Sequence, residues 1–214
     1  MDEFPFLFEL FTLLISLAVA EVLGGFARIL KLRARRKAGV DPHAIRVRVG
    51  WLVPLLGLLV LLDLATFWNI MWGAREVLDM RMAMVFGVLT LIGGYYLVST
   101  LVFPDEPELW PDFDAYFWQQ KPVVVWGILA LNLAAQGAIM ALGGGQAQDP
   151  AAMQRFVESH PLFSFASLAL LFNFPAFAWL ALTKGKRRAI ALMAFVIATQ
   201  ILFAISSWEL KGQL

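Results

Sequence analysis

Six stretches of mostly apolar residues, each long enough to cross a bilayer, constrain the fold of this chain more than any other feature. They run approximately over residues 6–32, 51–72, 82–103, 123–142, 162–182 and 189–208. An α-helix needs about 20 such residues to cross a hydrocarbon core of roughly 30 Å. The 214 residues are 60% hydrophobic and only 15% charged, whereas soluble domains carry about 25% charged residues. The sequence therefore predicts an all-α, polytopic integral membrane protein, a single domain built as a six-transmembrane-helix bundle.

The positive charges predict how this bundle is oriented. Most of the 17 Lys and Arg residues lie in the first, third and fifth connections or at the helix ends beside them. They are Arg28, Lys31, Arg33, Arg35, Arg36, Lys37, Arg46, Arg48, Lys121, Lys184, Lys186, Arg187 and Arg188. The positive-inside rule places such connections in the cytoplasm. Both the N- and the C-terminus are therefore expected on the non-cytoplasmic side.

Two clusters of these basic residues are candidates for binding anionic lipid headgroups. The clusters are Arg33, Arg35, Arg36 and Lys37, and Lys184, Lys186, Arg187 and Arg188. Each cation near an anionic membrane surface adds about 1 kcal/mol to binding. The orientation rule by itself also explains these charges. In either case membrane lipids are expected partners of these two basic clusters.

Two connecting segments have helical features of their own. In the acidic segment 104–122, Trp110, Phe113 and Phe117 recur at helical spacing. We expect there either a short helix in the membrane interface or an aromatic-anchored connector. In the outer loop 143–161, Asp149 and Pro150 predict the start of a second short helix. That helix is expected to rest on the membrane surface or to cover a pocket.

Asp63 is the clearest ionisable group inside an apolar stretch. It lies near the middle of residues 51–72, and Thr66, one helical turn further on, faces the same way. A charged carboxylate near the bilayer centre costs about 2.5–3.5 kcal/mol on insertion scales and is tolerated mainly in a protein or aqueous interior. Asp63 is therefore expected to face inward, where it either exchanges a proton or bonds an amide across a helix interface as a structural contact.

Glu21 is the second carboxyl group inside an apolar stretch. Ser16, Ala20 and Gly24 recur beside it at four-residue spacing, which predicts the close approach of another helix. Apolar surroundings favour the neutral form of a carboxyl group, so Glu21 is also a candidate for proton exchange. The structural alternative is an ion pair with Arg28, seven residues on and on the same face of the helix.

Four amide side chains complete the polar set inside the apolar stretches, and they are candidates for lining a transport path. They are Asn132, Gln136, Asn173 and Gln200. Aligning the two halves of the chain pairs Glu21 with Gln136 and Asp63 with Asn173, as an inverted repeat of three plus three helices would. Pro175 is expected to break the fifth helix near Asn173. The matching segments are short, and apolar sequences align easily.

Several kinds of chemistry lack the residues that they need. The chain has no cysteine, and its two histidines, His43 and His160, lie outside the apolar stretches, which argues against a haem or metal centre in the bundle. Residues 93–96, Gly-Gly-Tyr-Tyr, are expected to mark close helix packing rather than an ion filter. The sequence has no nucleotide-binding or nucleophile motif, and its net charge of +1 gives no reason to expect nucleic acid. We expect no catalytic residue, cofactor or metal.

The leading functional hypothesis is a small transporter or channel that moves protons, cations or a small solute. Glu21 and Asp63 would bind the proton or cation, and the four amides would line the path. One alternative is a noncatalytic membrane subunit or scaffold that binds a partner membrane protein or forms a homo-oligomer. A third hypothesis is a lipid-binding membrane protein. Short loops and a short chain favour the cytoplasmic (inner) membrane of a bacterium.

Overall fold

The computed structural model describes residues 4–39, 47–74, 81–142 and 150–208, and the regular elements of these residues are helices. The elements are α1 (Phe4–Ala38), α3 (Leu52–Gly73), α4 (Met82–Thr100), the 3-10 turn η1 (Pro107–Leu109), α5 (Phe113–Ala141), α6 (Pro150–Ser159), α7 (Pro161–Leu171), α8 (Asn173–Leu182) and α9 (Lys186–Ser206). Within this part of the chain, six helical segments are long and apolar enough to cross a membrane, and α7 and α8 together form one of them. This confirms the predicted all-α bundle with six candidate membrane spans.

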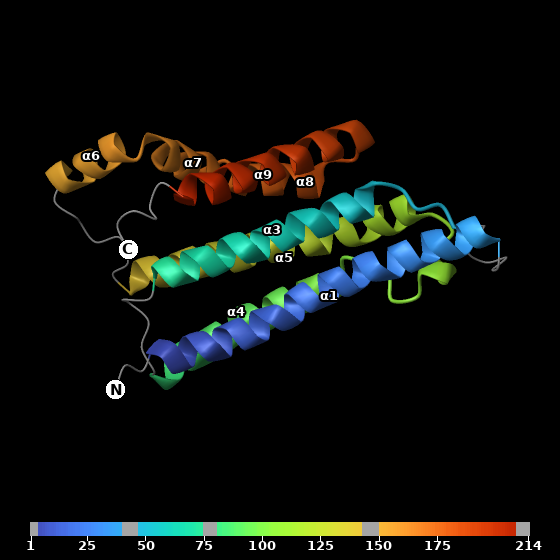
Figure 1. Ribbon diagram of the computed structural model, residues 1–214, viewed down its shortest axis with the longest axis horizontal. Helices are drawn as coiled ribbons and strands as arrows, with labels where there is room; N and C mark the ends of the chain where they lie inside the picture. Colours follow the sequence, from blue (N-terminus) through green and yellow to red (C-terminus); the bar gives the residue numbers. More distant parts are fainter. Residues whose placement is uncertain (1–3, 40–46, 75–80, 143–149, 209–214) are drawn as a thin grey trace.

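The helices are arranged in three layers (Figure 1). The helices α1 and α4 pack on each other in one outer layer, α3 and α5 form the middle layer, and α7, α8 and α9 form the other outer layer. The middle layer joins the other two, because α3 packs on both α1 and α9 while α5 packs on both α4 and α8. A polar group in the middle of α3 is therefore surrounded by protein.

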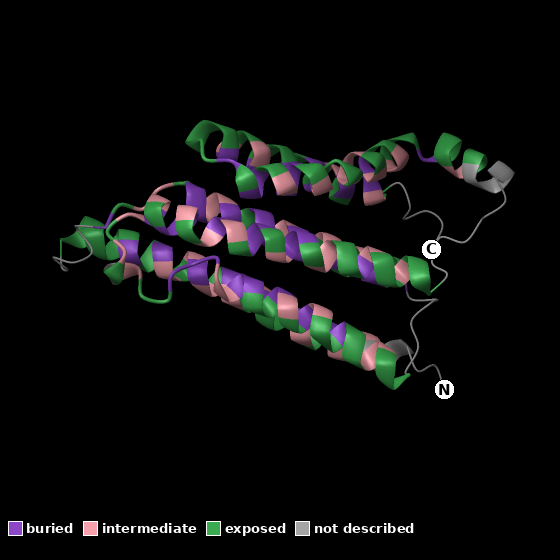
Figure 2. Cartoon of the chain, turned by 180° about the vertical axis from the view of Figure 1, so that it is seen from behind, coloured by how far each residue is buried: buried purple, intermediate pink, exposed green. Residues whose placement is uncertain are grey.

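Large apolar side chains face outward as well as inward. Leu13 is 64% exposed, Phe86 is 61% exposed and Leu168 is 57% exposed, although each belongs to a candidate span. Exposed residues occur along the whole length of the bundle and not only at its ends (Figure 2). Extended exposed apolar surfaces are rare on proteins that face water. They are the surface that acyl chains would cover.

The buried face of α1 differs from the one that the small-residue pattern predicts, so that prediction is wrong. Ser16 and Ala20 are exposed, and nothing would lie within 4 Å of a methyl group at Gly24. The close approach occurs instead at the next residue, where a methyl group on Gly25 would lie 2.1 Å from Cδ2 of Phe103. Successive helical residues point about 100° apart, so the placement of Phe103 decides which glycine is needed.

Phe103 is a buried wedge between two helices. Its side chain is 2% exposed, and a methyl group on Gly57 of α3 would lie 2.5 Å from its ring. Its ring also meets the edge of the Phe26 ring at a centroid distance of 5.0 Å. The glycines at positions 25 and 57 therefore leave the space that one aromatic ring fills between α1 and α3.

The acidic segment 104–122 does not form a separate interfacial helix. After η1, its residues from Phe113 onward are the first turns of α5, which continues through Pro122. The helix begins where the Asp112 carboxylate accepts a hydrogen bond from the Asp114 backbone N–H at 2.9 Å. Phe113 and Phe117 are fully buried. Their apolar surface is thus used in packing against the bundle and not in an interfacial anchor.

The outer loop contains the expected short helix, α6, which begins at Pro150. Residues 143–149, including the predicted capping residue Asp149, lie outside the described residues. His160, which separates α6 from α7, is 4% exposed, and its ring lies 4.7 Å from the ring of Phe156. The contacts of His160 are therefore local to the corner between the two helices.

The fifth span is broken where the sequence predicts a break. The helix α7 ends at Leu171 and α8 begins at Asn173, with Phe172 between them. Pro175 has no N–H for the carbonyl group of Leu171, and its ring would clash with that carbonyl in an unbroken helix. The inverted repeat that the same residues suggested stays a prediction.

Three connections meet at one end of the bundle, which we call the basic end: the end where α1 and α8 stop and α3, α5 and α9 begin. The backbone N–H of Arg48 donates to the Pro111 carbonyl at 2.8 Å, and the Phe113 N–H donates to the Arg48 carbonyl at 3.1 Å. Lys186 forms an ion pair with Asp114. Assignment of the basic end to the cytoplasm stays a prediction of the charge pattern.

Adjacent glycines in α1 provide a test of this packing. Gly25→Ala should lower the free energy of unfolding by about 1–3 kcal/mol, because the added methyl group has to displace the base of a buried ring. Gly24→Ala should leave it unchanged or raise it by up to about 1 kcal/mol, because alanine favours helix and the site is open. Unfolding in mixed micelles, followed by circular dichroism, measures both variants. Equal decreases in the free energy of unfolding of the two variants would contradict the assigned buried face of α1.

Candidate functional site

Asp63 lies at the centre of the bundle. It occupies the middle of α3 and is 4% exposed, with Leu59, Val60 and Leu64 buried beside it in the sequence. The surrounding residues are apolar and favour a helix, so they place the carboxyl group in the interior of the bundle. A buried carboxyl group without hydrogen-bond partners would strongly destabilise the fold.

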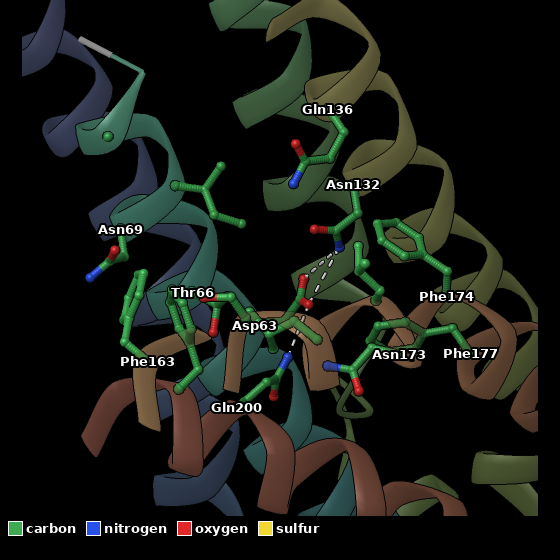
Figure 3. Close-up of a pocket in the computed structure, with 16 residues that line it drawn as sticks. Asp63, Thr66, Asn69, Asn132, Gln136, Phe163, Asn173, Phe174, Phe177 and Gln200 are labelled. Carbon is green, nitrogen blue, oxygen red and sulfur yellow. Dashed lines mark hydrogen bonds between the residues drawn. The ribbon is translucent and has the colours of Figure 1, made fainter. Parts of the chain in front are cut away.

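Side chains from three other helices donate hydrogen bonds to Asp63. The hydroxyl of Tyr95 in α4 donates to Oδ2 at 3.0 Å, and the amide of Gln200 in α9 donates to Oδ1 at 3.1 Å. The amide of Asn132 in α5 lies 3.1 Å from Oδ2 and 3.3 Å from Oδ1. Figure 3 shows Asn132 and Gln200 approaching the carboxylate from opposite sides. One carboxyl group thus connects four helices.

A second polar contact lies next to this network. The hydroxyl of Thr199 in α9 donates to Oδ1 of Asn173 in α8 at 2.8 Å, and both residues are buried. Thr199 directly precedes Gln200, whose Oε1 atom is buried without a hydrogen-bond partner. The polar interior of the bundle therefore includes α8 as well.

A cavity of about 330 Å³ lies beside the carboxylate, between the middle layer and the layer of α7, α8 and α9. Its lining runs along α3 from Asp63 through Thr66 and Asn69 to Gly73, the last residue of that helix. On the other side α7 packs mainly on α9, and of its described residues only Ala166 is buried. The cavity therefore extends from Asp63 toward the end of the bundle opposite the basic end.

The lining combines polar side chains around Asp63 with a largely apolar remainder that includes several aromatic rings. Asn132, Gln136, Asn173 and Gln200 lie on the polar side. The rings of Phe163, Phe174, Phe177 and Phe203 contribute to the rest of the wall. No lysine, arginine or histidine is among the described residues that line the cavity. The charge of an ionised Asp63 is consequently not balanced by a fixed cation of the wall.

The structure brings together most of the residues that the sequence predicts for a transport path. Asp63 and the four amides Asn132, Gln136, Asn173 and Gln200 all line this one cavity. Glu21 does not line it. Arg28 donates a hydrogen bond to Oε1 of Glu21 at 2.9 Å, and the two side chains are 33% and 25% exposed, respectively. The ion pair that we considered as the structural alternative for Glu21 is therefore present.

Sequence reasoning missed Tyr95. The Gly-Gly-Tyr-Tyr segment was interpreted only as a packing motif, and Gly94 does pack closely, since a methyl group there would lie 2.6 Å from Leu131. Tyr95 is completely buried, whereas Tyr96 is 40% exposed. A tyrosine within a span that shares its helix face with buried residues such as Ile92 and Val98 was the available signal. Asn69, Ser167 and Thr199 were also not singled out.

Toward the basic end, polar contacts join the middle layer to the layer of α7, α8 and α9. Lys121 of α5 is 2% exposed, and its ammonium group donates to the carbonyl of Thr183, which caps the C-terminus of α8. A cation at a helix C-terminus is favoured by the helix dipole. The ion pair of Lys186 with Asp114 adds a second connection between the same layers. Sequence analysis had assigned Lys121 only a role in orientation.

A second cavity, of about 400 Å³, lies at the basic end. Of the lipid-headgroup candidates, Arg36 and Lys186 line it, together with Arg48, Asp112 and Asp114. The guanidinium group of Arg33 lies 5.5 Å from the ring centroid of Trp51. The remaining candidates are exposed: Arg35, Lys37, Lys184, Arg187 and Arg188. Headgroup binding by these residues stays a prediction.

Comparison of the chain with protein-family models, with curated proteins and with solved structures found no match. The described residues contain no cluster of three or more His, Asp or Glu side chains that could hold a metal ion. The function is therefore argued from the geometry of the Asp63 site.

Two adjacent tyrosines test the hydrogen-bond network. Tyr95→Phe removes a donor to Asp63 and should lower the free energy of unfolding by about 0.6–2 kcal/mol, the range measured for hydrogen bonds inside membrane proteins. Tyr96→Phe, at an exposed position, should change it by less than about 0.5 kcal/mol. Both are measured by unfolding in mixed micelles. An effect of Tyr96→Phe as large as that of Tyr95→Phe would count against the network.

Proposed function

We propose that this protein is a small membrane transporter in which Asp63 alternately holds a proton and a cation. The observation that carries the proposal is a buried carboxyl group that faces a cavity and is bonded only by neutral donors. Ionisable groups inside candidate spans usually mark a substrate or ion pathway. Asp63 is the only carboxyl group among the described residues that line this cavity.

The hydrogen-bond network makes both protonation states of Asp63 accessible. Burial in a bundle without a nearby fixed cation favours the neutral acid. The donors from Tyr95, Asn132 and Gln200 favour the ionised form by hydrogen bonding. The ionised form still carries an uncompensated charge, which a cation in the cavity would balance. Proton and cation therefore compete for the same carboxyl group, and this competition couples their movement.

Access to Asp63 is different from the two sides of the bundle. The cavity extends from the carboxyl group toward the end opposite the basic end. At the basic end, the bond of Lys121 to Thr183 and the ion pair of Lys186 with Asp114 join the layers. Transport requires that the second side opens when the first closes. The layer of α7, α8 and α9 is the part that would move, because it contains the break at Phe172.

Proton movement in proteoliposomes tests the role of Asp63. The vesicles contain the protein and the pH-sensitive dye pyranine inside. Their internal pH should change under an imposed potential or after addition of Na⁺, K⁺ or 2-phenylethylammonium. Asp63→Asn should abolish this response, because the amide cannot exchange a proton, and circular dichroism checks that the variant is folded.

Glu21→Gln is the matched control for this assay. Its carboxyl group is paired with Arg28 and does not line the cavity, so the response should stay within about twofold of wild type. Vesicles whose response equals that of empty vesicles under every condition would refute the proposal. So would an unchanged response in the Asp63→Asn variant.

Cross-linking at the basic end tests whether that end opens. The chain has no cysteine, so a variant with Asp114→Cys and Lys186→Cys carries the only two thiols. A short reducible bis-thiosulfonate should stop the flux by holding α5 to α9, and a reducing agent should restore it. Each single cysteine variant, treated in the same way, should keep its flux. Full flux in the cross-linked protein would show that the basic end does not open.

A further inference from the structure

We infer that the cavity beside Asp63 binds a small organic ammonium ion. This inference rests on the proposed function only in treating that ion as the transported cargo. Two features of the wall support this ligand class. They are a carboxylate without a fixed counter-ion and a group of aromatic rings.

In its ionised form, Asp63 favours a positively charged ligand. The donors that reach Asp63 are a hydroxyl and two amides, all neutral, and the described lining contains no basic side chain. An ionised carboxylate in a low-dielectric interior is stable only when it is paired. A neutral ligand would leave this charge uncompensated, and an anion would add a second one.

The aromatic wall favours an organic cation over a bare metal ion. Phe163, Phe174, Phe177 and Phe203 line the cavity, and Figure 3 shows three of these side chains around the Asp63 network. Ring faces attract ammonium groups and pack against hydrocarbon. Metal cations such as Mg²⁺ and Ca²⁺ need a cage of oxygen atoms, whereas Asn132 and Gln200 direct N–H groups at the carboxylate.

The size of the cavity limits the ligand. A volume of about 330 Å³ is at the small end of ligand pockets, which span roughly 300–1,000 Å³. A single ring or a short alkyl chain that carries one ammonium group suits this space. We therefore choose 2-phenylethylammonium as the probe and 2-phenylethanol as its neutral analogue, since the two have the same number of heavy atoms.

Equilibrium dialysis of the two probes against the protein in lipid nanodiscs tests the inference, with empty nanodiscs as background. Wild type should bind the ammonium about tenfold more tightly than the alcohol, the size expected for a charge-assisted hydrogen bond. Asp63→Asn should reduce this preference to about twofold or less. Glu21→Gln should retain the wild-type preference, because Glu21 lies outside the cavity lining. Circular dichroism verifies that each variant is folded.

A second pair of variants tests the site without altering the acid. Phe174→Leu should weaken ammonium binding by about twofold to fivefold, as the loss of a cation–π contact does, with a smaller effect on the alcohol. Phe195→Leu in α9, at a position 44% exposed on the outside of the bundle, should have no effect on either probe.

The outcomes separate the ligand class from the proposed function. Equal affinity of wild type for the two probes, or binding of neither, would overturn the ammonium inference. Proton flux that depends on Asp63 would in that case still support the transporter. Preferential ammonium binding without any flux would support the binding site and contradict transport.

Discussion

The carboxyl group of Asp63 has to be satisfied inside an apolar bundle, and the rest of the structure depends on how this is done. Four helices contribute to the solution, because Tyr95, Asn132 and Gln200 reach Asp63 from α4, α5 and α9. Lipid supplies no hydrogen bonds at this depth. The helices must therefore hold a fixed spacing around one carboxylate, and the middle layer of α3 and α5 is where this spacing is set.

The same network is incomplete in a way that suits a transporter. It provides hydrogen bonds but no positive charge, and it leaves Oε1 of Gln200 without a partner. The break between α7 and α8 adds to this picture, because α7 packs mainly on α9 and leaves a cavity in front of the carboxylate. The carboxyl group without a fixed counter-ion and the cavity thus coincide at one point.

The two ends of the bundle differ in how tightly the layers are joined. At the basic end, Lys121 bonds the C-terminal carbonyl of α8, and Lys186 pairs with Asp114. Toward the other end, the lining of the cavity separates the same layers as far as Gly73. Phe103, packed between Gly25 and Gly57, fixes α1 against α3. Both outer layers pack extensively on the middle layer, and the layer of α7, α8 and α9 differs from the other in containing the break at Phe172 and one wall of the cavity.

The sequence by itself determined the class of fold, the six candidate spans, the break near Asn173 and most residues of the site. It could do so because hydrocarbon excludes charge and unpaired backbone groups, which leaves a pattern that is readable along the chain. Only the tertiary structure decided which partner each polar group has. It placed Tyr95 on Asp63, paired Glu21 with Arg28 and gave close packing to Gly25 instead of Gly24. These choices depend on the rotation of each helix and on contacts between residues far apart in the chain, which periodicity within one helix does not specify.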